Sequence, residues 1–137
     1  MNYLPPAARD DAGLLASEDV LPALSAWSAA GQRAALVTLA GIEGGSPRGI
    51  GAQMAVCEDG TYAGYLSGGC LEQAIALEAQ ALLEKGENRL VRYGRGSPYF
   101  DIRLPCGSGL DVYFDCRLTP ATISDMARLR RDRMPFA

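Results

Sequence analysis

With 137 residues, 48% of them hydrophobic, the chain is long enough for one domain that buries roughly two-thirds of its unfolded surface. Its 13 basic and 16 acidic residues give a net charge of −3, which excludes a general electrostatic attraction to nucleic acid or to an anionic membrane. Histidine is absent, which excludes histidine-based catalytic triads and zinc hydrolase sites.

No run of residues approaches the ~18 apolar residues of a membrane span, and no basic N-terminal region precedes an apolar core as in a signal peptide. The cytoplasm is therefore the expected compartment. The cysteines form no Cys-x-x-Cys pair, their spacings match no zinc pattern, and a chain with its own core does not need disulfides. We expect reduced thiols at Cys57, Cys70, Cys106 and Cys116.

Met1–Ala16 is predicted to be a loose leader or a short first helix, and a helix is predicted over Asp19–Ala30. Val20, Leu24 and Trp27 recur at the four-then-three spacing of a buried helical face. Gly31 is the residue type that commonly follows a helix C-terminus. Trp27 is interpreted as a core anchor, with a ligand-binding platform as the alternative.

The next segment, Ala34–Ala40, is apolar and β-branched enough to predict a buried strand, and Gly41 is expected to start a loop. Within that glycine-rich loop, Ser46-Pro47-Arg48 places a planar guanidinium after a stiffened turn. Such a group suits a phosphate or a carboxylate. The alternative is a glycine-rich connection with an exposed arginine.

A hairpin follows. Ala52–Glu58 and Tyr62–Leu66 read as strands, and the intervening Asp59-Gly60 is a strong hairpin pattern. Antiparallel pairing of these strands brings the Arg48 loop and the turn that begins at Ser67 to the same end of the sheet. Cys57, inside the first strand, is interpreted as a small hydrophobic residue.

The turn Ser67-Gly68-Gly69 leads into a helix predicted over Leu71–Lys85, with Cys70 at its start. The N–H groups of a helix start attract negative charge, and such a position lowers the pKa of a thiol. Cys70 is therefore a candidate reactive or cofactor-contacting group. Glu72 is expected on the polar side of the helix, where it favours the helix dipole; a role as proton acceptor near Cys70 is the alternative. The apolar stripe consists of Leu71, Ile75, Ala79, Leu82 and Leu83.

Two strands complete the predicted sheet, Asn88–Tyr93 and Leu110–Asp115. Tyr99–Leu104 is ambiguous. The turn before the second strand holds Cys106 between Pro105 and glycines, and if that strand lies beside the hairpin, Cys106 and Cys70 approach one another. The interpretation is a site for a large, anionic, sulfur-containing ligand.

The remaining residues begin with Thr119-Pro120, which can start a last helix. Five arginines stand from Arg117 onward, and they read as a solvated helix end, a docking surface or the start of a linker. The predicted fold is a single α/β or α+β domain with a core over 19–116 and a tail over 117–137. It contains a mixed sheet of about five or six strands and two main helices, Asp19–Ala30 and Leu71–Lys85.

Four spaced motifs resemble the xanthine dehydrogenase accessory family (XdhC/CoxI) in content and order. They are Gly45-Ser46-Pro47-Arg48, Gly51-Ala52-Gln53-Met54, Asp59-Gly60 with Gly64 through Ser67-Gly68-Gly69-Cys70-Leu71-Glu72, and Leu104-Pro105-Cys106-Gly107. The resemblance covers roughly Trp27 to Asp115. It implies a chaperone that binds molybdenum cofactor, protects it during sulfuration by a cysteine desulfurase, and helps insert it into xanthine dehydrogenase or a related molybdenum hydroxylase.

The resemblance also implies roles for individual residues. Arg48 and its loop would take the phosphate of molybdopterin, while Cys70 and Cys106 would face the molybdenum or carry transferred sulfur, with Glu72 nearby. The implied cofactor-binding residues are Gly45, Ser46, Pro47, Arg48, Ser67, Gly68, Gly69, Cys70, Cys106 and Gly107.

Two departures from the family pattern stand out. Ser108 replaces the second glycine of the usual Cys-Gly-Gly, which adds a side chain where the backbone would approach a ligand. No Gly-x-Gly-x-x-Gly follows Asp115, so the Rossmann-type domain of many members is not expected and nucleotide binding is not carried over. The chain is either a short single-domain member or a shortened one.

The resemblance favours a cofactor-insertion chaperone over an enzyme. Two alternatives stay open: a sulfur-transfer or redox enzyme that uses Cys70 and Cys106, and an interaction module without catalysis. A homodimer is compatible with the apolar composition.

Overall fold

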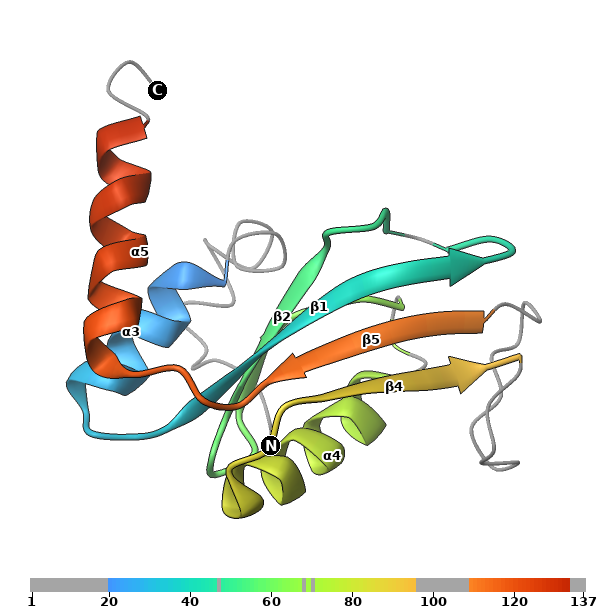
Figure 1. The fold of residues 1–137 in the computed structure, drawn as a ribbon, viewed down its shortest axis with the longest axis horizontal. Coiled ribbons are helices and arrows are strands. Elements are labelled where there is room, and N and C mark those ends of the chain that lie inside the picture. The colour runs from blue at the N-terminus through green and yellow to red at the C-terminus, as the bar shows by residue number, and fades with distance from the viewer. Residues whose placement is uncertain (1–19, 47, 68, 70, 96–108, 134–137) are drawn as a thin grey trace.

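The computed structural model describes residues 20–46, 48–67, 69, 71–95 and 109–133 (Figure 1). Within these ranges the chain forms three helices and five strands, which confirms the predicted single domain of mixed helices and strands. In chain order they are α3 (Leu21–Ala29), β1 (Ala34–Glu43), β2 (Gln53–Cys57), β3 (Tyr62–Gly64), α4 (Glu72–Lys85), β4 (Arg89–Gly94), β5 (Gly109–Asp115) and α5 (Pro120–Arg133).

The five strands form one sheet in the order β3-β2-β1-β5-β4. A mixed sheet was expected, but all four pairings between these strands are antiparallel. Since α4 carries the chain across the sheet from β3 to β4 and each neighbouring pair runs antiparallel, the fold is better described as α+β.

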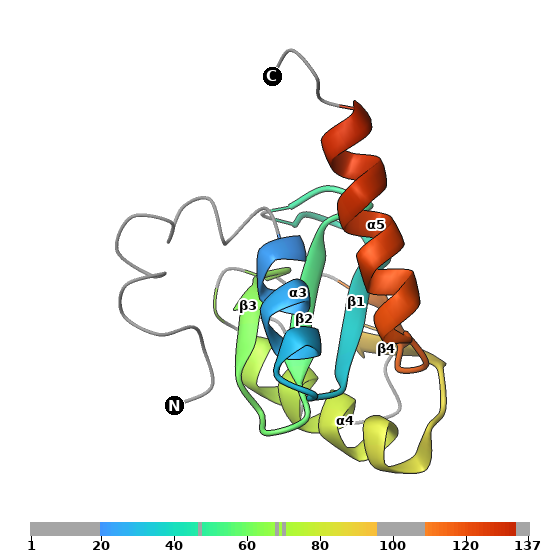
Figure 2. The same cartoon turned by 90° about the vertical axis from the view of Figure 1, so that its left-hand side faces the viewer.

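The sheet has helices on both faces, and the alternation of buried residues along β1 shows why. Ala35, Val37 and Leu39 point into the larger core, which α4 closes with its apolar stripe. Ala34 points the other way, into a second core that α3 and α5 close. Figure 2 shows α3 in front of β2, with α5 on the same face of the sheet. The predicted apolar stripe of α4 is confirmed, because all of its members are buried.

The second core buries apolar side chains of α3 and α5. Trp27 is buried there, as expected for a core anchor, and α3 ends before Gly31, whose φ is +80°. The helix predicted to begin at Thr119-Pro120 is α5, and its Ile123 is buried against α3. Thus the segment after Arg117 packs onto the domain through at least its first turns.

The expected loop at Gly41 is wrong, because β1 continues to Glu43 and pairs there with β5. A register shift lies between Leu39 and Gly41, and Gly41 stands opposite Asp111. A Cβ on Gly41 would lie 2.7 Å from the Asp111 carboxylate, so glycine at this position permits close packing inside a bulged strand.

The hairpin of β2 and β3 is confirmed, with Val56 paired to Tyr62 across the turn. By contrast, β5 does not lie beside this hairpin. It pairs with β1, and three inter-strand steps of about 4.8 Å separate it from β3. The condition set for an approach of Cys70 and Cys106 is therefore not met, and both cysteines lie outside the described residues.

Replacing Gly64 by alanine tests the close packing of β3 on β2 and α3. Gly64 has φ +86°, and an added Cβ would lie 2.7 Å from the Gln53 carbonyl oxygen and 2.8 Å from Val20 Cγ1. Left-handed strain and overpacking together should lower the free energy of unfolding by about 3 kcal/mol in urea titration.

The matched control is Gly31→Ala. Gly31 has a similar φ of +80° but no atom within 4 Å of the added Cβ, so only the conformational strain of about 1 kcal/mol is expected. Equal losses in the two variants would contradict the packing role of Gly64.

Candidate functional site

The topology brings three connections to one end of the sheet. β1, β3 and β4 end there, and β2 and β5 begin there, because neighbouring strands alternate in direction. The connections that start and finish there are 44–52, 65–71 and 95–108, and every residue predicted to bind a ligand belongs to one of them; of the third, the structure describes only residue 95. We call this end of the sheet the rim. At the end of the sheet opposite the rim lie the turn between β2 and β3 at 58–61 and the turn between α4 and β4 at 86–88.

The turn after β3 is organised by a buried carboxylate, that of Glu72, which is only 4% exposed. Its Oε2 accepts hydrogen bonds from the N–H groups of Leu66 and Ser67, each at 2.7 Å. Its Oε1 accepts from the Ser67 hydroxyl at 2.9 Å and from the Gly69 N–H at 2.8 Å. The Ser67 hydroxyl oxygen in turn accepts from the Leu71 N–H at 2.9 Å. The turn is therefore wrapped around a side chain of the first turn of α4.

The expected position of Glu72 on the polar side of the helix is wrong. The sequence places it correctly in the first turn, but the chain folds back over it, so that it points into the protein. As a consequence, the anion that the N–H groups of Ser67 and Gly69 bind is the protein's own carboxylate. Contacts of these two residues with an external ligand stay a prediction.

The pKa of Glu72 is lowered from its usual value of 4.5. Burial is the largest influence and opposes ionisation, but the hydrogen bonds from Ser67 and Leu66 together outweigh it. Glu72 is consequently ionised at neutral pH. A carboxylate with a lowered pKa is a weak base, and this one already accepts four hydrogen bonds from the turn. Both features favour a structural role over proton transfer.

Arg48 links the loop after β1 to the segment after β3. Its Nη1 donates to the Tyr65 carbonyl oxygen at 3.0 Å, and its guanidinium carbon lies 4.7 Å from the centre of the Tyr65 ring. The Arg48 N–H donates to the Ser46 hydroxyl at 3.3 Å, which folds the loop locally. The prediction that the Arg48 loop and the Ser67 turn share one end of the sheet is thus confirmed.

The remaining predicted site residues divide into two groups. Gly45 is exposed and Ser46 half-buried on the Arg48 loop. The positions outside the described residues are Pro47, Gly68, Cys70, Cys106 and Gly107. Their contacts with a cofactor therefore stay predictions, and Cys70 is placed only by its covalent neighbours Gly69 and Leu71.

The two cysteines that the structure describes, Cys57 and Cys116, are buried thiols. Burial is the main cause that raises the pKa of each to about 11, so neither is a thiolate at neutral pH. The interpretation of Cys57 as a small hydrophobic residue is confirmed. Over the described ranges, no three His, Cys, Asp or Glu side chains cluster as metal ligands.

Sequence reasoning missed the contribution of Tyr65 and the inward position of Glu72. Tyr65 carries no pattern of its own, because only the fold brings Arg48 over its ring. Glu72 did leave a trace: it stands three residues after Gly69, the spacing of the reciprocal capping arrangement at helix starts.

Comparison with known proteins matches the XdhC and CoxI family over residues 27–94. This segment of the chain belongs to the XdhC and CoxI family. It contains the Arg48 loop, Tyr65 and the whole Glu72 network. No helix among the elements described is long and apolar enough to cross a membrane.

Two known proteins are similar to this chain over part of their own length. Over 82 residues the chain is 56% identical to the molybdenum cofactor insertion chaperone PaoD of Escherichia coli (strain K12), covering 60% of this chain and 26% of PaoD. A xanthine dehydrogenase from Bacillus halodurans, known from a crystal structure, is similar with a TM-score of 0.63 and 28% identity, covering 79% of this chain and 33% of that chain. This chain thus spans about a quarter to a third of either relative.

Replacing Glu72 by glutamine tests whether its carboxylate organises the XdhC and CoxI turn. The amide would place N–H donors against N–H donors and remove the charge, so we expect a loss of about 3 kcal/mol in the free energy of unfolding at pH 7. Urea titration measures it. Glu84→Gln, at an exposed position of the same helix, is the control and should change stability by less than about 0.5 kcal/mol.

The difference in stability between wild type and Glu72→Gln should depend on pH. Since the folded-state pKa of Glu72 is lowered, its stabilisation is complete above the unfolded pKa, near 4.5, and is lost as the pH falls through the folded pKa. Wild type should therefore lose more stability than Glu72→Gln between pH 5 and about pH 3. Parallel pH profiles for the two proteins would show that the carboxylate is not the stabilising form.

Proposed function

We propose that this chain supplies the cofactor-binding domain of a chaperone that binds molybdenum cofactor and assists its insertion into a molybdenum hydroxylase of the xanthine dehydrogenase type. The observation that carries the proposal is the Arg48 to Tyr65 link, which joins two rim connections inside the segment matched to the XdhC and CoxI family. PaoD is named as a molybdenum cofactor insertion chaperone.

The chemistry of the rim suits such a cargo. Molybdopterin carries a phosphate, a dithiolene and a polar ring, so it calls for a cation, hydrogen-bond donors and soft partners. Arg48 is half-buried, and its guanidinium is oriented by Tyr65 at the junction of the 44–52 and 65–71 connections. An arginine fixed in this way loses less side-chain freedom when a phosphate binds. We assign the phosphate to Arg48 with Gly45 and Ser46.

The N–H groups of the Ser67 turn take a different part in this proposal. Because they already bind the Glu72 carboxylate, they add no positive potential for the phosphate. Their part is to fix the backbone on both sides of Cys70. We propose that Cys70 and Cys106 face the molybdenum or carry transferred sulfur during sulfuration by a cysteine desulfurase, and that the chain binds its cargo without turning over purines.

The partners follow from the same proposal. They are a molybdenum hydroxylase as client and a cysteine desulfurase as sulfur source. The cytoplasm is the expected compartment, and a homodimer is one assembly to check during purification.

Binding of the cofactor to wild type and to Arg48 variants tests the assignment. The protein is incubated anaerobically with molybdenum cofactor, separated from unbound cofactor, and the fluorescence of the oxidised pterin in the protein fraction is measured. We expect Arg48→Ala to weaken binding about tenfold or more, since a charge-assisted hydrogen bond is worth about 1.5 to 3 kcal/mol. Arg48→Lys should recover part of the affinity, because it keeps the charge but not the planar fork.

Arg117→Ala is the control for this experiment. Arg117 is exposed and lies in the connection between β5 and α5, away from the rim, so its loss should leave binding unchanged. Unaltered affinity in Arg48→Ala would reject the phosphate role, and a wild-type protein that retains no pterin would reject the proposed function.

Cysteine variants test the sulfur chemistry separately. After incubation with a cysteine desulfurase and cysteine, mass spectrometry should find a persulfide on Cys70 or Cys106, but not on Cys57 or Cys116, whose raised pKa keeps them protonated. Cys70→Ala and Cys106→Ala should also retain less cofactor. If both variants bind the cofactor as wild type does, the role of these cysteines at the molybdenum is rejected. If no persulfide is found on either cysteine, their role as sulfur carriers is rejected.

A further inference from the structure

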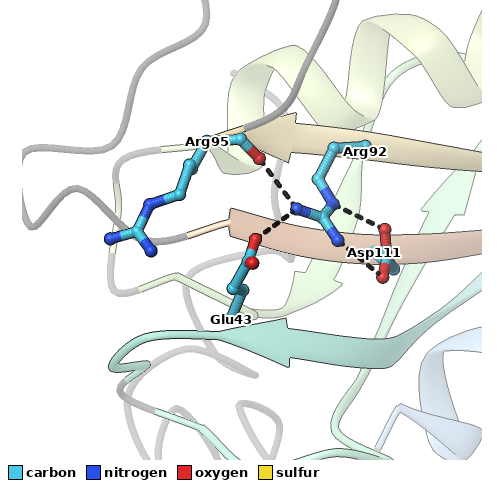
Figure 3. Close-up of polar contacts among 4 residues, drawn as sticks. All are labelled: Glu43, Arg92, Arg95 and Asp111. Carbon is cyan, nitrogen blue, oxygen red and sulfur yellow. Dashed lines mark hydrogen bonds and ion pairs between the residues drawn. The ribbon is translucent and has the colours of Figure 1, made fainter.

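The structure contains a second polar cluster at the rim, centred on Arg92 of β4 (Figure 3). Its guanidinium lies across β5 and binds the Asp111 carboxylate through two hydrogen bonds, Nε to Oδ1 at 2.7 Å and Nη2 to Oδ2 at 3.2 Å. Nη1 donates both to Glu43 Oε1 at 2.9 Å and to the Arg95 carbonyl oxygen at 2.8 Å. One side chain therefore joins three strands.

The residues that Arg92 binds stand where the strands end. Glu43 is the last residue of β1, directly before the Arg48 loop, and Arg95 directly follows β4. Asp111 of β5 lies opposite Gly41, which belongs to the bulged part of β1. The part of β1 after Leu39 pairs with β5 and has no partner in β2, since β2 begins opposite Thr38. The cluster consequently braces the stretch of β1 that extends past the hairpin.

Two glycines make room for this cluster. A Cβ on Gly41 would lie 2.7 Å from Asp111 Oδ2, and a Cβ on Gly109 would lie 2.7 Å from both Arg92 Nη1 and the Arg95 carbonyl oxygen. Backbone and charged groups are therefore in contact on both sides of the guanidinium. The Arg92 and Asp111 side chains are about one-third exposed, whereas Glu43 is 54% exposed, so the bidentate pair with Asp111 and the two close glycines fix the strand ends more than the pair with Glu43 does.

The pKa of Asp111 is lowered, mainly by the hydrogen bonds from Arg92, so the pair is ionised at neutral pH. Two carboxylates lie against the Arg92 guanidinium, and each accepts hydrogen bonds from it. It is not built to attract an anion. Because Glu43 directly precedes the Arg48 loop, the position of the cluster indicates instead that it fixes the start of that loop.

We propose that Arg92 is a positioning residue of the rim: by holding Glu43, Asp111 and the end of β4 together, it fixes the end of β1 from which the Arg48 loop departs. The effect on a ligand follows from the proposed function, because Arg48 is the residue assigned to the phosphate. The effect on the loop is independent of that function. Arg92 itself is not expected to touch the cofactor.

The test compares Arg92→Gln and Arg92→Lys with Arg89→Gln. Arg89 is a matched control, because it lies at the other end of β4 and forms two exposed ion pairs, with Glu78 at 3.8 Å and Glu87 at 3.0 Å. Hydrogen–deuterium exchange of peptides over 41–52 and over α4 is measured first, without any cofactor. Pterin retention is then measured as for the Arg48 variants.

We expect Arg92→Gln to raise amide exchange over 41–52 about tenfold while α4 stays unchanged, and to weaken cofactor binding by a similar factor. Arg92→Lys should give intermediate values, since it keeps one charge-assisted bond to Asp111. Arg89→Gln should match wild type in both measurements. A second control, Ile123→Val, loses stability in the core under α3 and α5, so it should lower the unfolding temperature without changing exchange over 41–52.

The outcomes separate the two proposals. Wild-type exchange over 41–52 in Arg92→Gln would overturn the positioning role, whatever the cofactor result. Equal loss of affinity in Ile123→Val and Arg92→Gln at the same unfolding temperature would overturn it as well, because a general loss of stability would then account for the effect. Raised exchange in a protein whose wild type retains no pterin would keep the positioning role and reject the proposed function.

Discussion

A buried carboxylate holds the part of this domain on which the candidate site depends. Glu72 is held in the interior by four hydrogen bonds, three from backbone N–H groups and one from the Ser67 hydroxyl. An unpaired charge at such a position would be strongly destabilising, so the turn and the carboxylate require each other. The backbone on either side of Cys70 is fixed because Gly69 and Leu71 both belong to this network.

The rest of the rim is built from similar contacts between neighbouring connections. Arg48 connects the 44–52 loop to Tyr65, and Arg92 connects the ends of β1, β4 and β5. Both guanidinium groups donate to a backbone carbonyl oxygen, and each makes a further contact, Arg48 with the Tyr65 ring and Arg92 with two carboxylates. Rigid strand ends and short polar links thus support loops that carry the family motifs, the usual arrangement for binding residues on a stable scaffold.

The comparisons are consistent with this separation between the loops that carry the motifs and the strand ends that support them. The segment matched to the XdhC and CoxI family, residues 27–94, includes the Glu72 turn and the Arg48 loop, while Asp111 of the Arg92 cluster lies beyond it. The match to the Bacillus halodurans structure covers 79% of this chain at 28% identity, whereas the match to PaoD covers 60% at 56% identity. The chain represents about a quarter of PaoD, so any steps that need the rest of such a protein lie outside this domain.

The sequence by itself determined the local elements and the family. Helical periodicity placed the apolar stripe of α4, Asp59-Gly60 placed the hairpin, and the spaced glycine, arginine and cysteine motifs identified the family domain, because these features depend on residues near one another in the chain. Only the tertiary structure decided the strand order, the continuation of β1 past Gly41 and the inward position of Glu72. Each of these depends on a distant partner. Gly41 reads as a strand breaker until Asp111 is found against it, and Glu72 reads as a surface residue until the preceding turn closes over its carboxylate.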